Sequence, residues 1–297
     1  MSVSNVPHRP STNSRSLGEK LSNGGVIAPG VFDALTAHLA SSAGFDTLYL
    51  SGAAVAYTRL GRPDIGLVSI SELADTLTLI RDRVDSSIIV DGDTGFGNAI
   101  NVQRSIRTLE RAGANAVQLE DQTFPKRCGH LKDKALVSAS EMVGKVKAAL
   151  DARRDPNMLI IARTDAIAVE GFERAIERAQ LYAEAGADIL FVEAPPSQDE
   201  LARIVKNLAT HLPLLANMVE GGRTPIQSAE DLHALGFKLV IFPGGIVRAL
   251  ALQAQDFYQS LRTNGQTNAF RSRMLDFDGL NSILGLQELL DQSNIYK

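Results

Sequence analysis

Six apolar runs in this chain end in polar or charged residues that could take part in chemistry. Each run is about the length of a β-strand. The ends are Ser51-Gly52-Ala53, Asp91-Gly92-Asp93, Glu120-Asp121, Arg163-Thr164-Asp165, Glu193 and Asn217. If the runs are parallel strands of a barrel, their carboxyl ends meet at one rim. The sequence then predicts a carboxylate-rich cup that contains an arginine.

Three carboxylates of this cup could together bind a metal ion. Asp91 and Asp93 are two residues apart, so on an extended segment both side chains point to the same side. With Glu120 nearby they offer hard oxygen ligands, which favour Mg²⁺ or Mn²⁺ over zinc. The alternative is that the aspartates cap the following helix. Three acids in one pocket would repel one another without a cation, which favours the metal.

Arg163 ends a β-branched run, where a buried guanidinium needs a partner. It could bind a substrate carboxylate through two parallel hydrogen bonds. It could instead form a structural salt bridge with Asp165 or Glu193. The position at the rim favours the substrate.

The segment 122–134, QTFPKRCGHLKDK, is too polar for a core and predicts an exposed loop that closes over the cup. It carries the only cysteine of the chain, Cys128, followed by Gly129 and His130. The cations of the loop are Lys126, Arg127, Lys132 and Lys134. A lone cysteine is most often a small buried hydrophobic residue. Here the basic surroundings predict a lowered thiol pKa, and His130 is a candidate proton partner.

The elements that must position these residues alternate along the chain. Eight apolar runs predict strands: Gly25–Pro29, Thr47–Ser51, Ser87–Asp91, Ala116–Glu120, Leu159–Arg163, Ile189–Glu193, Pro213–Asn217 and Leu239–Pro243. Several runs, such as SIIVD and ILFVE, lack polar alternation, which is typical of parallel strands covered on both faces. Helical patterns separate the runs. Eight βα units predict an α/β fold that is a single (β/α)8 TIM-type barrel rather than a doubly wound sheet.

Both ends of the predicted helices carry sequence signals. Capping boxes predict three helix starts: Ser69-x-x-Glu72, Ser138-x-x-Glu141 and Ser197-x-x-Glu200. A glycine follows a helix and precedes a strand in four places: AGFD at 43–46, AGAN at 112–115, AGAD at 185–188 and LGFK at 235–238. Four copies of one junction indicate a repeated βα unit.

The chain divides into three predicted parts. Residues 1–15 are polar and predict a flexible arm, residues 16–250 the barrel, and residues 251–297 a C-terminal helical appendage. Helical patterns at Val247–Leu261 and Leu280–Leu290 exceed what a barrel needs. We therefore expect the appendage to pack on another subunit.

The composition limits the class of protein. The 44% hydrophobic and 22% charged residues are enough for a folded core, and the net charge of -4 argues against nucleic acid or an anionic membrane as partner. No apolar run approaches the ~20 residues of a membrane-spanning helix, and the N-terminal residues lack the apolar region of a secretory signal. A single cysteine excludes an internal disulfide and suits a reducing compartment. We expect a cytoplasmic protein.

Several segments, taken in order, resemble the isocitrate lyase / phosphoenolpyruvate mutase superfamily. They are LSGAAVAYTRLGRPDIG (50–66), VDGDTGFGNAINV (90–102), LEDQTFPKRCGH (119–130), ARTDA (162–166), FVEA (191–194) and LLANMVEGGRTP (214–225). KRCGH after LEDQ is the most specific, and the similarity covers roughly residues 15–265. The resemblance implies a (β/α)8 barrel, a Mg²⁺ ion with Mn²⁺ possible, and a homotetramer whose C-terminal helices swap between paired subunits.

The resemblance also implies roles for individual residues. Asp91 would ligate the metal directly, and Asp93 and Glu120 directly or through water. The residues that would act in catalysis are Cys128, His130, Arg163 and Glu193. The residues that would contact the substrate are Ser51, Gly52, Ala53, Asp64, Gly129, Arg163, Glu193, Asn217 and Arg248. Among these, Arg163 resembles the clamp on a 2-oxo-acid carboxylate.

Cys128 selects one branch of the superfamily. It resembles the acid of the members that cleave carbon–carbon bonds, which mutase and phosphonopyruvate hydrolase members generally lack. Two positions depart from the methylisocitrate lyases: Ala53 stands where they have a second glycine, and Phe277 stands near an expected arginine. Loss of that cation weakens the case for a tricarboxylate and puts a smaller dicarboxylate, such as a 2,3-dialkylmalate, on an equal footing with it.

The predicted reaction is a Mg²⁺-dependent retro-aldol cleavage of a 2-hydroxy di- or tricarboxylate, of the 2-methylisocitrate or 2,3-dimethylmalate type. The products are a 2-oxo acid and a carboxylic acid, whose enediolate Cys128 would protonate. Candidates for the base are Tyr49, His130 and a hydroxide held by the metal. The alternatives are an oxaloacetate decarboxylase, which needs no Cys128, a phosphonate-forming mutase, which Cys128 disfavours, and a non-catalytic barrel, which the retained carboxylates and Arg163 disfavour.

Overall fold

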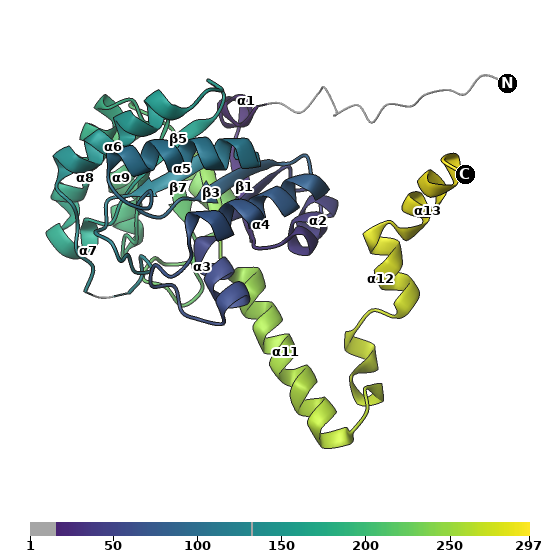
Figure 1. Ribbon diagram of the computed structural model, residues 1–297. Helices are drawn as coiled ribbons and strands as arrows, with labels where there is room; N and C mark the ends of the chain where they lie inside the picture. The colour runs from purple at the N-terminus through teal and green to yellow at the C-terminus, as the bar shows by residue number, and fades with distance from the viewer. Residues whose placement is uncertain (1–15, 132) are drawn as a thin grey trace. The chain divides into compact units, whose positions relative to one another are not determined.

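The structure is a computed structural model that describes residues 16–131 and 133–297 (Figure 1). Eight parallel strands close into a barrel in the order β1 to β8. Their bounds are β1 Val26–Val31, β2 Thr47–Leu50, β3 Ser87–Asp91, β4 Ala116–Glu120, β5 Leu159–Thr164, β6 Ile189–Val192, β7 Leu214–Asn217 and β8 Leu239–Phe242. The predicted barrel is confirmed. The expected N-terminal arm, residues 1–15, and Lys132 lie outside the described residues.

The strands form because their apolar residues are covered on both faces. Every residue of β2, β3 and β4 is buried, as the runs without polar alternation predicted. The first strand differs from its predicted range of Gly25–Pro29. It starts at Val26 and continues through Gly30 and Val31, because these two residues pair with β2.

Helices surround the strands and connect them (Figure 1). Their bounds are α1 Leu17–Asn23, α2 Ala34–Ser42, α3 Gly52–Val55, α4 Ile70–Arg83, α5 Ala99–Ala112, α6 Ala139–Ala152, α7 Ile167–Glu170, α8 Phe172–Glu184, α9 Gln198–Leu208 and α10 Ala229–Leu235, with a π-helical turn η1 at Ala56–Leu60. The four predicted helix–Gly–strand junctions are confirmed. Gly44, Gly113, Gly186 and Gly236 have positive φ angles of 95°, 102°, 102° and 128°, a region that glycine adopts without steric cost.

The three predicted capping boxes form to different extents. Ser69 and Glu72 make the full reciprocal box at the start of α4. Ser138 and Ser197 accept a hydrogen bond from the backbone N–H three residues on, but only this half of each box is formed. At α6 the other half is replaced, because the Glu141 carboxylate lies 4.0 Å from Lys145 on the next turn.

The interior of the barrel is filled with side chains rather than open. They include Tyr49, Ile89, Ile161, Phe191 and Leu239. Helix α1 closes the amino-terminal end, where Leu17 and Leu21 join this inner cluster and Lys20 Nζ donates to the Asp46 carbonyl at 2.6 Å. A plugged interior leaves the carboxyl end as the place for chemistry.

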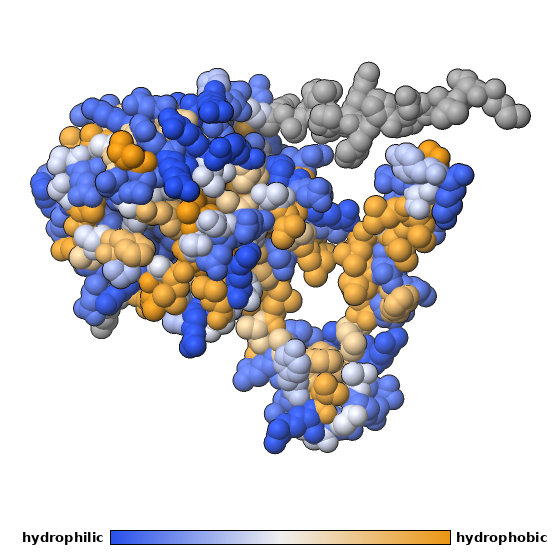
Figure 2. Space-filling view, in the orientation of Figure 1, coloured by the Kyte–Doolittle hydropathy of each residue, from blue (hydrophilic) through white to orange (hydrophobic). Residues whose placement is uncertain are grey.

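Residues Arg248–Lys297 form a second compact unit. Its elements are α11 Gly245–Asn264, which begins in the barrel unit, the 3₁₀ helix η2 Asn268–Arg273, α12 Phe277–Leu284 and α13 Leu286–Ile295. The pattern predicted as one helix at Leu280–Leu290 is broken at Gly285, which has a left-handed φ of 78°. Neither α12 nor α13 contains a buried residue, and apolar side chains lie exposed along both (Figure 2). Within the described residues, no helix is both long and apolar enough to cross a membrane.

Candidate active site at the carboxyl end of the barrel

Six strand ends bring the predicted polar residues to one rim. Ser51 follows β2 and caps α3, and Glu193 directly follows β6. Asp91, Glu120 and Asn217 are the last residues of β3, β4 and β7, and Arg163 is the last residue but one of β5. Glu120 and Arg163 are direct neighbours in the sheet. The predicted cup is therefore a feature of the fold.

Asp91 and Asp93 come together by a different route from the predicted one. Strand β3 ends at Asp91, and Asp93 has a left-handed φ of 47°, so the segment is not extended. Both carboxylates nevertheless face Gly52. A Cβ on that glycine would lie 3.3 Å from Asp91 Oδ2 and 3.5 Å from Asp93 Oδ1. The turn at Gly92 and Asp93, rather than strand alternation, places the second carboxylate beside the first.

Lys126 from the loop after β4 neutralises part of this acidic group. Its Nζ lies 2.6 Å from Asp64 Oδ1 and 2.7 Å from Asp93 Oδ1, and its side chain is 3% exposed. Burial alone would lower the pKa of Lys126, but the two carboxylates hold that pKa well above its usual range. The ammonium therefore stays charged, and it links the loop to Asp64 and to the end of β3.

Asp91, Asp93 and Glu120 are the residues that could hold a metal ion. Across residues 16–131 and 133–297, no three acidic, histidine or cysteine side chains are already arranged as a metal site. Burial raises the pKa of Asp93 to about 7 and raises that of Glu120 well above its usual range. Both carboxylate oxygens of Glu120 are buried and neither accepts a hydrogen bond, although Oε2 lies 3.1 Å from Arg163 Nη1. Lys126 and Arg163 compensate only part of the charge of these carboxylates, and an oxygen-only set of donors suits Mg²⁺.

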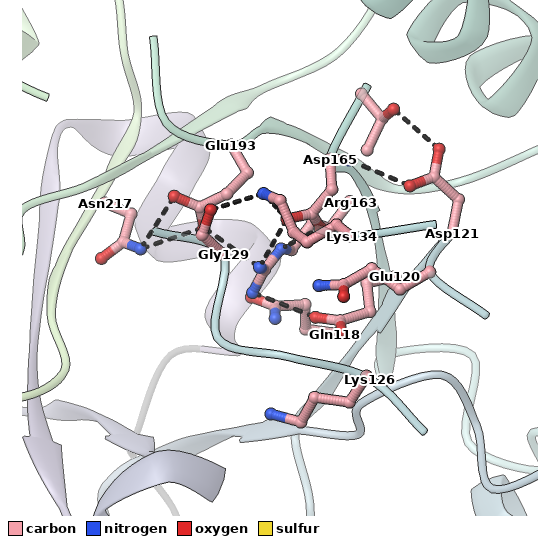
Figure 3. A network of polar contacts seen from close by, with 12 residues as sticks. Gln118, Glu120, Asp121, Lys126, Gly129, Lys134, Arg163, Asp165, Glu193 and Asn217 are labelled. Carbon is pink, nitrogen blue, oxygen red and sulfur yellow. Dashed lines mark hydrogen bonds and ion pairs between the residues drawn. The ribbon is translucent and has the colours of Figure 1, made fainter. Parts of the chain in front are cut away.

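Arg163 lies at the centre of a buried ion-pair network (Figure 3). Its Nε donates to Asp165 Oδ2 at 2.9 Å and its Nη2 to Asp165 Oδ1 at 3.0 Å. Nη1 lies 3.1 Å from Glu120 Oε2, and Nη2 lies 3.5 Å from Glu193 Oε2. Both structural partners that the sequence suggested, Asp165 and Glu193, are therefore present. The contact of Arg163 with a substrate carboxylate stays a prediction.

Asp165 is held from behind by a second buried network that the sequence did not indicate. Its backbone N–H donates to Asp121 Oδ1 at 2.9 Å, and Asp121 Oδ2 accepts from Thr164 Oγ1 and Tyr182 Oη at 2.7 Å each. Arg178 of α8 lies 3.3 Å from the same oxygen. This network fixes the end of β5, and with it the position of Arg163.

Glu193, Asn217 and His130 form the other side of the site. Asn217 Nδ2 donates to Glu193 Oε2 at 3.1 Å, and His130 Nε2 lies 3.3 Å from Glu193 Oε1. His130 Nδ1 accepts from the Arg223 backbone N–H at 3.0 Å, which places the ring proton on Nε2. Burial lowers the pKa of His130, so its ring is neutral at pH 7.

The thiol of Cys128 differs from its prediction. Burial, assisted by Asp64 and Glu193, raises its pKa instead of lowering it. The basic residues of the loop do not act on it as expected, because Lys126 and Lys134 are themselves paired with carboxylates. Cys128 contacts the backbone of His130, while the His130 ring faces Glu193. A thiol that stays protonated is suited to donate a proton.

The loop that carries Cys128 is anchored rather than freely exposed. Gln122 and Leu136 pair as an isolated β-bridge at its base, and the Thr123 N–H donates to the Ala135 carbonyl at 2.8 Å. At its tip, a Cβ on Gly129 would lie only 2.4 Å from Arg163 Nη2. The absence of a side chain at this position therefore lets the loop lie directly on the arginine.

Three remaining sets of predicted residues have different surroundings. Ser51 and Gly52 are buried and Ala53 is half-buried at the start of α3, next to Asp91 and Asp93. Asp64 is buried against Lys126. Arg248 is exposed and belongs to the second compact unit. The predicted contacts of Ser51, Gly52, Ala53, Asp64 and Arg248 with a substrate stay predictions.

One candidate base becomes less suitable in the structure. Tyr49 Oη donates to Gln118 Oε1 at 3.0 Å inside the barrel, and Gln118 Nε2 donates to Asp91 Oδ1 at 3.2 Å. Burial and the nearby Asp91 carboxylate raise the pKa of Tyr49 well above its usual range. The phenol therefore keeps its proton at neutral pH and orients Gln118.

Comparison with known proteins identifies the class. The model of the phosphoenolpyruvate phosphomutase family matches residues 18–262. A 2,3-dimethylmalate lyase of Eubacterium barkeri is 40% identical over 271 residues, which are 91% of this chain and 93% of that protein. A 2-methylisocitrate lyase of Aeropyrum pernix is 50% identical over 240 residues, which are 81% of this chain and 76% of that protein.

Solved structures agree with this assignment. An oxaloacetate acetylhydrolase bound to the inhibitor 3,3-difluorooxalacetate has a TM-score of 0.89 and 33% identity, covering 94% of this chain and 95% of its own. A phosphonopyruvate hydrolase in complex with oxalate and Mg²⁺ has a TM-score of 0.83 and 30% identity, covering 93% and 95%. The chain belongs to the PEP mutase/isocitrate lyase superfamily. Its relatives over most of its length are carbon–carbon lyases, and it is a lyase of this superfamily.

Proposed function

We propose that the protein is a Mg²⁺-dependent lyase that cleaves a 2-hydroxy di- or tricarboxylate of the 2-methylisocitrate or 2,3-dimethylmalate type. The products are a 2-oxo acid and a second carboxylic acid. The observation that carries the proposal is the position of Cys128, whose pKa burial raises, on a loop whose tip lies against Arg163 and Glu193. The two lyases with which the chain shares 40% and 50% identity support the same chemistry.

Cys128 acts as the general acid. Cleavage of the bond next to the hydroxyl-bearing carbon leaves an electron pair on a carbon beside a carboxylate, which needs a proton to become the product acid. The Cys128 Sγ–H supplies that proton to this carbon, and the thiolate regains it from solvent before the next turnover. The raised pKa of the thiol keeps it protonated at neutral pH and makes it a donor instead of a nucleophile.

Arg163 and the residues around it bind the oxo-acid half. Two of its nitrogens already face Asp165, which fixes the plane of the guanidinium. Nη1 and Nη2 also face Glu120 and Glu193, and a substrate carboxylate would share these donors. Glu193 and Asn217, which are hydrogen-bonded to each other, line the second half of the substrate. His130, neutral and next to Glu193, is the remaining side-chain candidate for the base, and its Nδ1 must release the Arg223 N–H before it can accept a proton.

Asp91, Asp93 and Glu120 would hold the Mg²⁺ ion. The buried oxygens of Glu120, which accept no hydrogen bond, and the raised pKa of Asp93 fit a divalent cation. When bound, the ion would stabilise negative charge that develops on the oxygen of the departing oxo acid. The phosphonopyruvate hydrolase structure with Mg²⁺ supports this choice of metal, and Mn²⁺ has the same preference for oxygen ligands.

A panel of substrates tests the proposal. The enzyme is incubated with Mg²⁺ and, separately, with 2-methylisocitrate, isocitrate, 2,3-dimethylmalate, oxaloacetate and phosphonopyruvate, and formation of a 2-oxo acid is followed. We expect cleavage of 2-methylisocitrate or 2,3-dimethylmalate to be fastest. Phe277 and Ala53, which depart from methylisocitrate lyases, weaken the case for the tricarboxylate and put the dimethylmalate on an equal footing with it. Release of inorganic phosphate from phosphonopyruvate as the main activity would refute a carbon–carbon lyase.

Oxaloacetate is a second candidate substrate, because the chain is similar to an oxaloacetate acetylhydrolase over 94% of its length. The products separate the possibilities. Pyruvate and CO₂ would identify a decarboxylase, whereas oxalate and acetate would identify hydrolytic cleavage. Either activity as the fastest on the panel would replace the proposed substrate class.

The C-terminal unit supports assembly into a homotetramer with helices exchanged between paired subunits. Its exposed apolar side chains are Leu250, Leu252, Tyr258, Met274, Leu275, Phe277, Leu280, Leu284, Leu286, Leu289, Leu290, Ile295 and Tyr296. So many exposed apolar residues on one short unit are typical of a surface that another chain covers. A single cysteine suits the cytoplasm as the place of this assembly.

A further inference from the structure

Lys134 is a buried cation that the proposed mechanism does not use. It stands at the far end of the Cys128 loop, just before the chain returns to the base of the loop at Ala135 and Leu136. Only 1% of its side chain is exposed. An ammonium group is strongly hydrated, so its burial requires charged or hydrogen-bonding partners.

The Nζ of Lys134 has two such partners, and they belong to different parts of the site. It donates to the backbone carbonyl of Gly129 at the tip of its own loop. It also lies 2.7 Å from Asp165 Oδ1, beyond the end of β5. One ammonium group therefore connects the far end of the loop with its tip at Gly129 and with Asp165 beneath it (Figure 3).

Asp165 is the same carboxylate that orients Arg163. Its Oδ1 accepts from both Lys134 and Arg163, and its Oδ2 accepts from Arg163 Nε. Burial alone would raise the pKa of Asp165, but Arg163 and Lys134 lower it to about 2, so the carboxylate stays ionised. The Asp121 network holds the backbone of Asp165 from the other side. The carboxylate to which Lys134 binds is thus held by Arg163, and its backbone by Asp121.

The tip of the loop lies very close to the site, so a small shift of the tip would displace the residues that it carries. Gly129 lies against Arg163 and Glu193 with no space for a side chain. Its neighbours Cys128 and His130 are the residues whose atoms must be placed correctly for proton transfer. The hydrogen bond from Lys134 to the Gly129 carbonyl acts on the residue between them.

We infer that Lys134 is a positioning residue that holds the Cys128-bearing tip of the loop on the Arg163–Asp165 ion pair. Loop closure and the orientation of the arginine therefore depend on one shared ammonium group. Its consequence for turnover rests on the proposed lyase function, whereas its consequence for the accessibility of Cys128 does not.

The test uses the variant Lys134→Met, in which the side chain keeps nearly the same length and loses its charge. The first measurement is the rate of alkylation of Cys128 by iodoacetamide without substrate, read by mass spectrometry. Because Cys128 is the only cysteine, one added group reports one site. We expect the rate to rise about tenfold or more, since a released tip exposes the thiol and lowers its pKa. The kcat for the best substrate should fall about 10²-fold, the cost of a misplaced catalytic group.

Lys147→Met is the matched control, because it makes the same change on the exposed side of α6. It should match the wild type in alkylation, kcat and thermal unfolding. A merely structural role of Lys134 would lower the unfolding temperature but leave alkylation unchanged well below that temperature. A folded Lys134→Met protein with wild-type alkylation and kcat would overturn the inference.

Two outcomes are kept apart by this design. If the wild type cleaves nothing on the substrate panel, the proposed function fails, and the alkylation rate still decides the role of Lys134. If Lys134→Met does not fold because Asp165 Oδ1 loses one of its two donors, Lys134→Gln takes its place. The glutamine keeps an N–H donor and no charge, and wild-type alkylation in that variant would equally overturn the inference.

Discussion

At the scale of single residues, burial decides which chemistry the site can perform. Burial raises the pKa of the Cys128 thiol and of the Tyr49 phenol, and it lowers the pKa of the His130 imidazole. All three shifts favour the neutral form of the group. Arg163, Lys126 and Asp165 stay charged because each has a partner of opposite charge. The site therefore combines neutral groups for proton transfer with fixed charges for binding.

Cys128→Ala should reduce carbon–carbon cleavage by about 10²–10⁴-fold, the usual contribution of a positioned proton donor. Binding of oxalate with Mg²⁺ should persist in this variant, because Arg163 and the three carboxylates are unchanged. Steady-state kinetics and calorimetric titration measure the two effects separately. Oxaloacetate decarboxylation should fall much less. If Cys128→Ala keeps its main activity on its best substrate, Cys128 is not the general acid.

The raised pKa of Cys128 predicts how activity and reactivity depend on pH. The thiol is the active form of an acid, so cleavage should persist at neutral pH and decline as the pH rises through a pKa above the usual thiol value of about 8.5. Alkylation by iodoacetamide needs the thiolate and should be slower at pH 7.5 than in the urea-unfolded chain. Substrate with Mg²⁺ should slow it further. Faster alkylation of the folded protein would show that its thiol pKa is lowered.

Removal of the metal tests the carboxylates. EDTA should abolish cleavage, and Mg²⁺ or Mn²⁺ should restore it. Asp91→Ala should weaken Mn²⁺ binding, measured by electron paramagnetic resonance, by more than the ~10–100-fold typical of a residue outside the ligand sphere. Asp75→Ala, which removes an exposed carboxylate of α4 that is not one of the three proposed ligands, is the control. Full activity of metal-free enzyme would contradict the proposal.

At the scale of elements, a helix and a loop close the two ends of the barrel in different ways. Helix α1 closes the amino end with apolar side chains, and the loop after β4 covers the carboxyl end with ion pairs. The first arrangement needs only hydrophobic contact, whereas the second depends on charges that a substrate or a metal can rearrange. The end that carries the chemistry is therefore the end whose cover is polar.

Leu21→Ala tests whether helix α1, which closes the amino-terminal end of the barrel, stabilises the fold. Leu21 is 4% exposed, and its truncation should lower the free energy of unfolding by about 2–5 kcal/mol, measured in urea. Leu79→Ala, at a position 63% exposed on α4, should change it by less than about 0.5 kcal/mol. Because α1 lies at the opposite end from the catalytic residues, kcat should stay unchanged at temperatures where the variant is folded. A loss of kcat without a loss of stability would contradict this assignment.

At the scale of the whole molecule, the protein has a barrel with a well-filled core and a C-terminal unit without one. The helices α12 and α13 bury no side chain, although leucine recurs along both. Helices with an uncovered apolar face gain stability when another chain covers it. Association of subunits would supply such a cover.

The protein should therefore be a tetramer in light scattering after size-exclusion chromatography. Leu289→Asp places a charge among the exposed apolar residues of α13 and should shift the protein to a smaller assembly. Ser293→Asp introduces the same charge on the same helix at a position that is already polar, and should leave the tetramer intact. A wild-type protein that is monomeric at micromolar concentration would refute the assembly.

The sequence by itself determined the barrel and the residues of its rim. Strand positions could be predicted because burial on both faces requires continuous apolar runs, and because glycine is needed where a helix turns back into a strand. The rim residues could be predicted because in a parallel barrel every strand ends at the same mouth. Each of these rules acts on residues that are close in the chain, so the sequence contains them.

The tertiary structure decided which charges meet. Lys126 and Lys134 look like solvated residues of a basic loop in the sequence, yet they are buried against Asp64, Asp93 and Asp165. For the same reason the pKa of Cys128 is raised, although its neighbours in the chain are basic. A pKa depends on burial and on the distance to every nearby charge, and residues far apart in the chain supply both. Local sequence therefore predicted where the site lies, and only the packed fold determined the charge that each group carries.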